Sequence, residues 1–93
     1  MNPNLRKAAI TKILRENFSP ETLGVEDEGH MHEGHVGARD GRGHFRALII
    51  SEAFEGKAMI ERHRMIYRVL GELMTNDIHA LAIDAWTPDE LDR

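Results

Sequence analysis

Residues 58–74 read AMIERHRMIYRVLGELM, and the spacing of the apolar side chains in this stretch decides the fold. Four of them recur with the i, i+3, i+4, i+7 spacing that gathers side chains on one face of a helix: Ile66, Val69, Leu70 and Leu73. The pattern predicts a helix from Ala58 to Met74, the longest in the chain. An element of this length needs a sheet or a second helix to cover its apolar face.

Three segments outside this helix are predicted to be strands. Phe45 to Ser51 contains the run Leu48-Ile49-Ile50 and is typical of a buried strand, and His79 to Ala85 is apolar and bounded. Thr22 to Asp27 is predicted to be a shorter strand.

Two more helices are expected near the ends of the sequence. Apolar residues recur with near-helical spacing from Leu5 to Phe18, so residues 4–17 are predicted to be helical. Ser19-Pro20 ends this helix, because proline lacks an amide hydrogen and disfavours a helical residue before it. Thr87-Pro88-Asp89-Glu90 has the pattern of a helix start.

The order of elements is therefore α-β-β-α-β-α, which predicts an α+β fold. A three-stranded mixed sheet with the helices at 4–17 and 58–74 on one face buries the apolar stripes most simply. The chain of 93 residues has room for one domain, and we expect residues 1–93 to form it around a loop at 29–43.

Composition excludes several classes of site and protein. The chain has no cysteine, so it forms neither a disulfide nor an all-thiolate metal site. No apolar run approaches the roughly 20 residues that span a bilayer, and no secretory signal is evident, so a cytoplasmic location is expected. The net charge is −4, yet residues 1–18 sum to +3. A basic face on an acidic protein and ordinary solvated helix surfaces both remain open.

The loop at 29–43 holds five glycines and three histidines close together, His30, His32 and His35. Neutral imidazole binds zinc, copper, nickel and iron, so the H-x-H-x-x-H spacing of these three histidines could bind a metal ion. The glycines leave such a site poorly preorganised, and a structural zinc site needs four ligands. An autonomous metal site is therefore the weaker interpretation of the loop.

The other three histidines have plain structural alternatives. His79 begins a predicted strand, where a backbone group could satisfy the hydrogen bonding of its imidazole. His63 lies within the long helix, and His44 could hold the base of the loop. No serine, threonine or cysteine has a convincing general base, and no phosphate-binding glycine motif occurs, so we do not expect an enzyme.

Several blocks of this chain resemble the BolA family in order and spacing, over roughly residues 4 to 90. The blocks are Glu28-Gly29-His30-Met31-His32, His44-Phe45-Arg46, Phe54-Glu55-Gly56, Arg62-His63-Arg64-Met65-Ile66-Tyr67 and His79-Ala80-Leu81. The resemblance implies an α-β-β-α-β fold similar to the class II KH domain, in agreement with the order of elements predicted above.

The resemblance also implies a role: partnership with a monothiol glutaredoxin and a shared [2Fe–2S] cluster. By this resemblance His79 is one ligand and His32 the second, with His35 and His30 as alternatives. The thiolates would come from the glutaredoxin and glutathione, and no cluster is expected in the isolated protein. Two imidazoles on one iron give a mixed-ligand cluster with a raised potential.

A second role suggested for the family is transcriptional regulation through DNA binding. Four cations in or near the long helix could contact phosphates: Lys57, Arg62, Arg64 and Arg68. The GxxG clamp of KH domains is absent, since Glu55-Gly56-Lys57 offers one glycine. Salt bridges and loop anchoring are equally good roles for these arginines.

Overall fold

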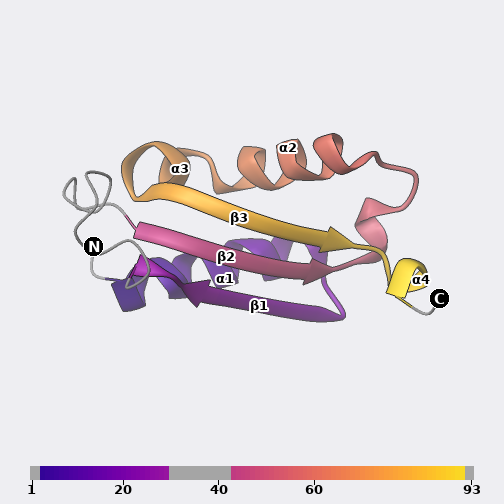
Figure 1. Ribbon diagram of the computed structural model, residues 1–93, viewed down its shortest axis with the longest axis horizontal. Helices are drawn as coiled ribbons and strands as arrows, with labels where there is room; N and C mark the ends of the chain where they lie inside the picture. The colour runs from indigo at the N-terminus through magenta and orange to yellow at the C-terminus, as the bar shows by residue number, and fades with distance from the viewer. Residues whose placement is uncertain (1–2, 30–42, 92–93) are drawn as a thin grey trace.

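The computed structural model describes residues 3–29 and 43–91 of the chain, and their elements follow the predicted order (Figure 1). The elements are α1 (Pro3–Phe18), β1 (Thr22–Asp27), β2 (Gly43–Ile50), the 3-10 turn η3 (Glu52–Phe54), α2 (Met59–Leu70), α3 (Glu72–Asn76), β3 (Ile78–Trp86) and α4 (Pro88–Leu91). Each predicted strand is present, with bounds that differ by at most two residues.

The three strands form one mixed sheet in the order β1-β2-β3. β1 pairs with β2 antiparallel, and β2 pairs with β3 in parallel. Leu48 on the central strand therefore lies between Gly24 on β1 and Asp84 on β3. This confirms the α+β fold with a three-stranded mixed sheet.

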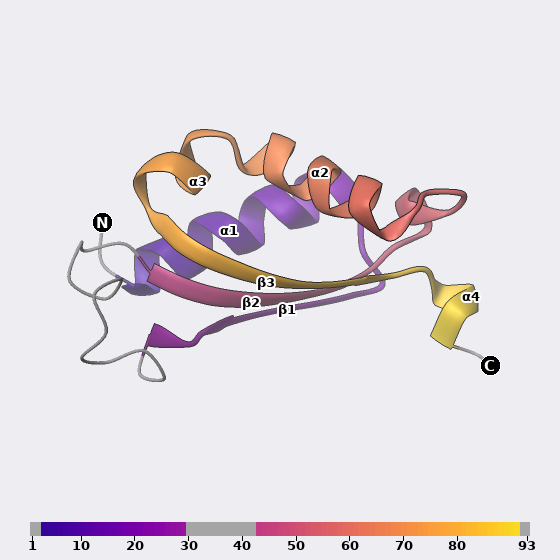
Figure 2. The ribbon, with the colours of Figure 1, turned by 45° about the horizontal axis from the view of Figure 1, so that its top comes forward.

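The helices α1, α2 and α3 cover one face of the sheet and leave the other face open (Figure 2). Burial alternates along β2 between the covered and the open face of the sheet. Phe45, Ala47 and Ile49 are buried, while Arg46 and Leu48 are exposed. α1 packs mainly against β1, and α2 and α3 pack against β3. The core lies between these layers and includes Ile10, Leu14, Phe18, Phe45, Ile49, Phe54, Ile66, Leu70 and Ile78.

The predicted single helix from Ala58 to Met74 is wrong in one respect, because the structure divides it at Gly71. α2 ends at Leu70, and the Gly71 amide donates to the Tyr67 carbonyl. Gly71 has a φ of 53°, a conformation that a residue with a Cβ adopts at a cost. The chain turns there and begins the separate, five-residue α3.

The connection after β2 also differs slightly from the expected turn. Ser51 leaves the sheet, and its hydroxyl donates to the Phe18 carbonyl at 2.6 Å while accepting from the Ala53 amide. These bonds start η3, which places Phe54 beside Phe18 with ring centroids 5.1 Å apart. Ser51 thus fastens the end of α1 to the end of β2.

Most of the loop expected at 29–43 lies outside the described residues, together with His30, His32 and His35. Within residues 3–29 and 43–91, no helix is long and apolar enough to cross a membrane.

Candidate functional site

His79 lies at the start of β3 and is exposed. The residue before it, Ile78, is only 1% exposed and belongs to the core. The register between β2 and β3 shifts here, since Gly43 pairs with Ile78 whereas His44 pairs with Ala80. His79 is therefore the extra residue of β3 at this irregularity, and β-bulges of this kind redirect side chains.

His44 on β2 is the neighbour of His79 in space. The two imidazole centroids are 4.9 Å apart, with the ring planes inclined at 51°. His44 is buried, with 7% exposure, whereas His79 faces solvent. The parallel pairing of β2 with β3 therefore brings together two imidazoles that are far apart in sequence.

The two ends of the 30–42 segment are fixed beside this histidine pair. The Glu28 amide donates to the His44 carbonyl at 2.7 Å, and the Gly43 amide donates to the Asp77 carbonyl at 2.9 Å. The chain therefore leaves β1 and enters β2 at the same end of the sheet as His79. The expected second ligand, His32, and its alternatives His35 and His30 belong to this segment, outside the described residues.

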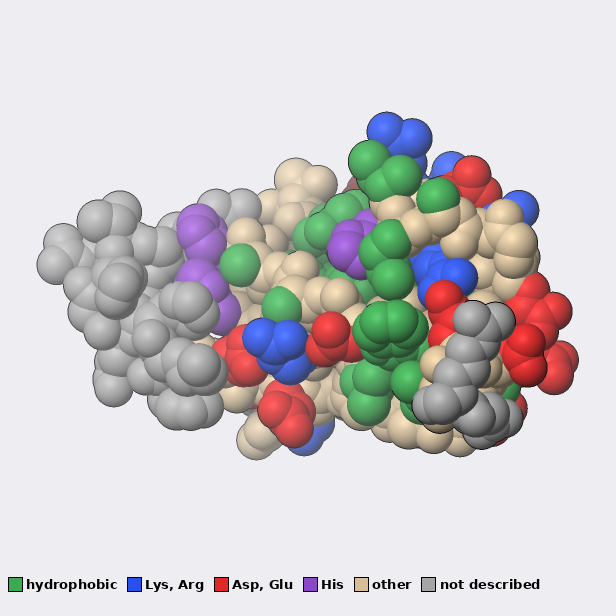
Figure 3. All heavy atoms as spheres, turned by 45° about the vertical axis from the view of Figure 1, so that its right-hand side comes forward, with side chains coloured by type: hydrophobic (Ala, Val, Ile, Leu, Met, Phe, Trp, Pro, Cys, Tyr) green, Lys and Arg blue, Asp and Glu red, His purple; other side chains and the backbone are tan. Residues whose placement is uncertain are grey.

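An ion-pair network crosses the open face of the sheet next to the histidines. Arg46 on β2 binds Glu28 at 3.1 Å and Asp84 on β3 at 3.2 Å. Its pKa is raised, chiefly because its side chain is hydrogen-bonded to Glu28. In Figure 3, one group of histidine side chains lies beside the grey residues at the left, a further histidine lies near the middle of the face, and acidic and basic side chains lie between and beyond them.

The described residues do not contain a complete set of metal ligands. No group of three or more histidine, cysteine, aspartate or glutamate side chains is arranged to hold a metal within residues 3–29 and 43–91. The exposed imidazole donor at this end of the sheet is His79, with the buried His44 behind it, in a chain without cysteine. Imidazole suits iron when other molecules supply the sulfur ligands.

The structure places Arg62 differently from the expectation of a phosphate contact. Its side chain is buried, with 6% exposure. The guanidinium donates to the Lys57 carbonyl at 2.9 Å, to the Ala85 carbonyl at 3.0 Å and to the Glu90 carboxylate at 2.7 Å. All of these partners are internal, so Arg62 anchors α2 to β3 and α4, which was the alternative role considered for it.

The other three cations remain at the surface of α2 or just before it. Arg64 and Arg68 are exposed and one turn apart, so their side chains share a face of the helix. Lys57 forms an exposed ion pair with Glu61 at 3.5 Å. The basic surface of α2 therefore reduces to Arg64 and Arg68, with Lys57 at its edge.

Sequence reasoning missed the contact between His44 and His79 and the burial of Arg62. A signal for the first was the position of both histidines at the start of strands that pair in parallel. A signal for the second was the helical line Arg62, Ile66, Leu70, which places the arginine on the apolar face.

Comparison with known proteins places the chain among BolA-like proteins. The model of the family described as BolA-like protein matches residues 14–90. The chain is 40% identical over 91 residues to SufE-like protein 1, chloroplastic/mitochondrial, of Arabidopsis thaliana, covering 92% of this chain and 24% of that protein. It is 37% identical over 81 residues to the DNA-binding transcriptional regulator BolA of Escherichia coli, covering 87% and 74%.

A solved structure agrees with these sequence matches. The BolA domain of SufE1 from Arabidopsis thaliana superposes with a TM-score of 0.84 at 39% identity, over 97% of this chain and 98% of that one. The chain spans about a quarter of the full SufE-like protein 1, at 24% of its length, and about half of the Arabidopsis Protein BOLA1, at 55%.

Proposed function

Since the chain belongs to the BolA-like family, we propose that it is a non-enzymatic cytoplasmic adaptor that binds a monothiol glutaredoxin and shares a [2Fe–2S] cluster with it. It would act in iron–sulfur cluster trafficking or iron regulation. The observation that carries the proposal is an exposed imidazole, His79, packed against His44 where the histidine-rich segment is anchored.

The histidines of the site have different roles in this proposal. His79 is the protein's fixed ligand, because its strand is held in the sheet while its ring faces outward. His44 is buried behind it and limits the orientations of the His79 ring, as outer-shell groups do at metal sites. His32 is the proposed second ligand, with His35 and His30 as alternatives.

The partner completes the ligand set. The chain has no thiolate, so the glutaredoxin cysteine and glutathione would supply the sulfur ligands of the heterodimer. Imidazole ligation of one iron raises the reduction potential of such a cluster above that of an all-thiolate one. Exposure of His79 is what allows a second protein to approach it.

The test is the visible absorption and circular dichroism spectrum of the chain mixed with a monothiol glutaredoxin, glutathione and iron and sulfide under reducing conditions. We expect the His79→Ala variant to lose the mixed-ligand spectrum and leave that of the glutaredoxin with glutathione. Its fold should persist, since an exposed imidazole contributes little to the core. The His32→Ala variant should retain the cluster for a shorter time, with His35 able to substitute in part.

A matched control is His63→Ala, which removes a histidine from α2 and should leave the spectrum unchanged. An unchanged mixed-ligand spectrum in the His79→Ala variant would exclude His79 as a ligand.

The second candidate function is that of a DNA-binding transcriptional regulator. Arg64 and Arg68 are exposed on one face of α2, and the names of two relatives, from Escherichia coli and Haemophilus influenzae, describe such a regulator. In this case duplex oligonucleotide binding should weaken steeply with salt and should weaken further in an Arg64→Ala/Arg68→Ala variant. If duplex binding changes neither with salt nor in this double variant, Arg64 and Arg68 do not form a DNA-binding surface.

A further inference from the structure

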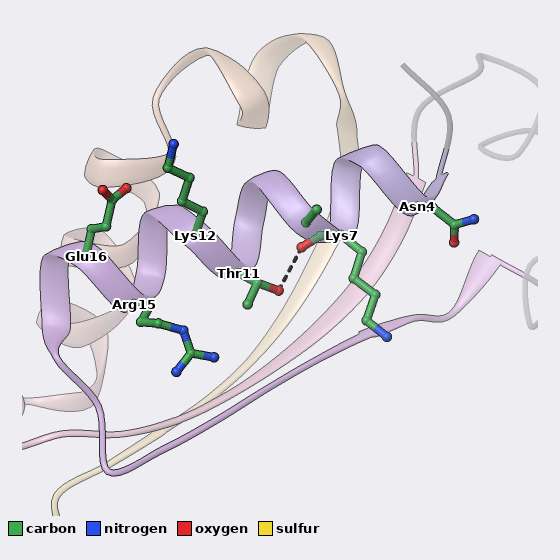
Figure 4. A pocket seen from close by; sticks show the side chains of 7 residues that line it. Asn4, Lys7, Thr11, Lys12, Arg15 and Glu16 are labelled. Carbon is green, nitrogen blue, oxygen red and sulfur yellow. Dashed lines mark hydrogen bonds between the residues drawn. The ribbon is translucent and has the colours of Figure 1, made fainter.

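A groove of about 550 Å³ runs along α1 and is lined only by residues of this helix (Figure 4). Small side chains, Ala8 and Thr11, form its floor. Long side chains border it, with Lys7 and Arg15 directed to one side and Lys12 and Glu16 to the other (Figure 4). The groove is therefore open along the helix axis and closed at its flanks by flexible, mostly cationic side chains.

The charge of the groove is positive and unbalanced. Three cations border it against a single carboxylate, Glu16. None of Lys7, Lys12 and Arg15 forms an ion pair with another residue of the described part of the chain, whereas Arg6 on the same helix pairs with Asp77 at 3.6 Å. Much of the +3 charge of residues 1–18 is thus concentrated on this surface.

The floor of the groove offers apolar contact rather than hydrogen-bond donors. The Thr11 hydroxyl donates to the Lys7 carbonyl at 2.7 Å, and the backbone amides in mid-helix are bonded within the helix. A phosphate would therefore find side-chain charge but none of the free backbone amides that phosphate sites use. Leu5, one turn before Ala8, is 57% exposed and extends the apolar surface.

We propose that this groove of α1 docks an acidic amphipathic helix of a second protein. Lys7 and Arg15 are two turns apart, about 12 Å along the axis. Acidic side chains two turns apart on a partner helix would reach both cations. A ridge of alanine and leucine side chains on that helix would lie on the floor formed by Ala8 and Thr11, as ridges pack into grooves between helices.

A second copy of this chain does not supply such a helix from its described part. The exposed face of α2 carries Arg64 and Arg68, which would repel the groove. α4 has four residues, and its Glu90 is bound to Arg62. α3 has five residues. Since no helix within residues 3–29 and 43–91 fits, the proposal commits to a different protein with a longer acidic helix.

The groove begins at the end of the domain that holds the histidine pair, because Arg6 on α1 pairs with Asp77, two residues before His79. From there its lining residues continue along α1 to Glu16. The groove does not include His79 or His44, and this inference does not rest on the proposed function.

The probe for the test is a capped, fluorescently labelled peptide of about 20 residues, long enough to hold a helix in water. It is built from glutamate, alanine and leucine with glutamates two turns apart beside an alanine–leucine ridge. The measurement is fluorescence anisotropy at low salt. We expect a Lys7→Glu/Arg15→Glu variant to bind it roughly tenfold more weakly, since two attractions become repulsions.

A second variant tests the floor without changing charge. Ala8→Trp should fill the groove and weaken binding to a similar degree, while Arg64→Glu/Arg68→Glu on α2 is the matched control and should bind the peptide as the parent does. All of these positions are exposed, so the far-UV circular dichroism of the variants should match that of the parent.

Three results would overturn the proposal. The first is equal binding of a peptide with lysine in place of glutamate. The second is loss of binding in the α2 control but not in the α1 variants. The third is an oligonucleotide duplex, rather than the peptide, whose binding depends on Lys7 and Arg15. His79→Ala should leave peptide binding unchanged, so a failed cluster experiment and a failed peptide experiment are distinguishable.

Discussion

At the scale of single residues, Arg62 is a polar side chain whose removal should destabilise the domain strongly. Its guanidinium binds two backbone carbonyls and the Glu90 carboxylate, and these groups belong to three separate segments. Without it, the Ala85 carbonyl would lie buried with no donor from this side chain, and Glu90 would lose its counter-charge. Burial of unpaired polar groups is among the few causes of a large loss of stability by a single substitution.

We expect Arg62→Ala to lower the free energy of unfolding by about 2–4 kcal/mol. Arg64→Ala, two positions along the same helix, is the matched control and should change it by less than about 0.5 kcal/mol because Arg64 is exposed. Urea denaturation followed by circular dichroism gives both values. Similar losses in the two variants would contradict the anchoring role of Arg62.

At the scale of elements, the sequence predicted the strands because their apolar runs are short and bounded. It predicted the helical stretch from Ala58 to Met74 but not its division. The apolar pattern continues from Ile66 to Leu73 without interruption, and a single glycine within a helical pattern is tolerated at a modest cost. The chain turns at Gly71 with a positive φ, and α3 then packs against β3, a tertiary contact that local periodicity does not contain.

The candidate site was predictable to the same limited degree. The ligand role of His79 is a prediction from the family resemblance, whereas its contact with His44 depends on strand register over a long sequence separation. For Arg62 the sequence left phosphate contact and anchoring as alternatives, and the buried contacts with Ala85 and Glu90 favour anchoring. A parallel pairing and a buried cation are both decided by the assembled fold.

We expect Gly71→Ala to destabilise the domain by roughly 1–3 kcal/mol, because alanine pays for the positive φ that ends α2. Gly24→Ala is the matched glycine control. A Cβ at Gly24 meets nothing within 4 Å, and no left-handed backbone is needed there, so that variant should be close to neutral. Urea midpoints compare the two, and an equal loss in both would argue against a conformational role for Gly71.

At the scale of the whole molecule, the bond between Arg62 and Glu90 couples the last helix to the rest of the domain. Hydrogen bonding from Arg62 is the main reason that the pKa of Glu90 is lowered from 4.5 to about 2. The Thr87 amide also donates to this carboxylate, at 2.7 Å. The ionised form of Glu90 is therefore favoured in the folded state.

A carboxyl group whose pKa is lower in the folded state contributes stability above its unfolded pKa. That contribution is lost as the pH falls through the folded pKa, here between about 4.5 and 2. We expect the urea midpoint to fall over this window more steeply in the parent than in Glu90→Gln. Glu52→Gln, an exposed change on η3, is the control and should follow the parent curve. Identical pH curves for the parent and Glu90→Gln would show that the bond between Arg62 and Glu90 does not contribute to the pH dependence of stability.

The position of β2 in the centre of the sheet has a consequence for synthesis on the ribosome. One edge of β2 pairs with β1, which is made earlier, but the other edge waits for β3. Until Ile78–Trp86 has emerged, a nascent chain presents the unpaired backbone of β2 next to Phe45, Ala47 and Ile49. An open strand edge of this kind recruits other chains. Chains that stop before β3 are therefore the ones that should need a chaperone, while the full sheet closes the central strand on both sides.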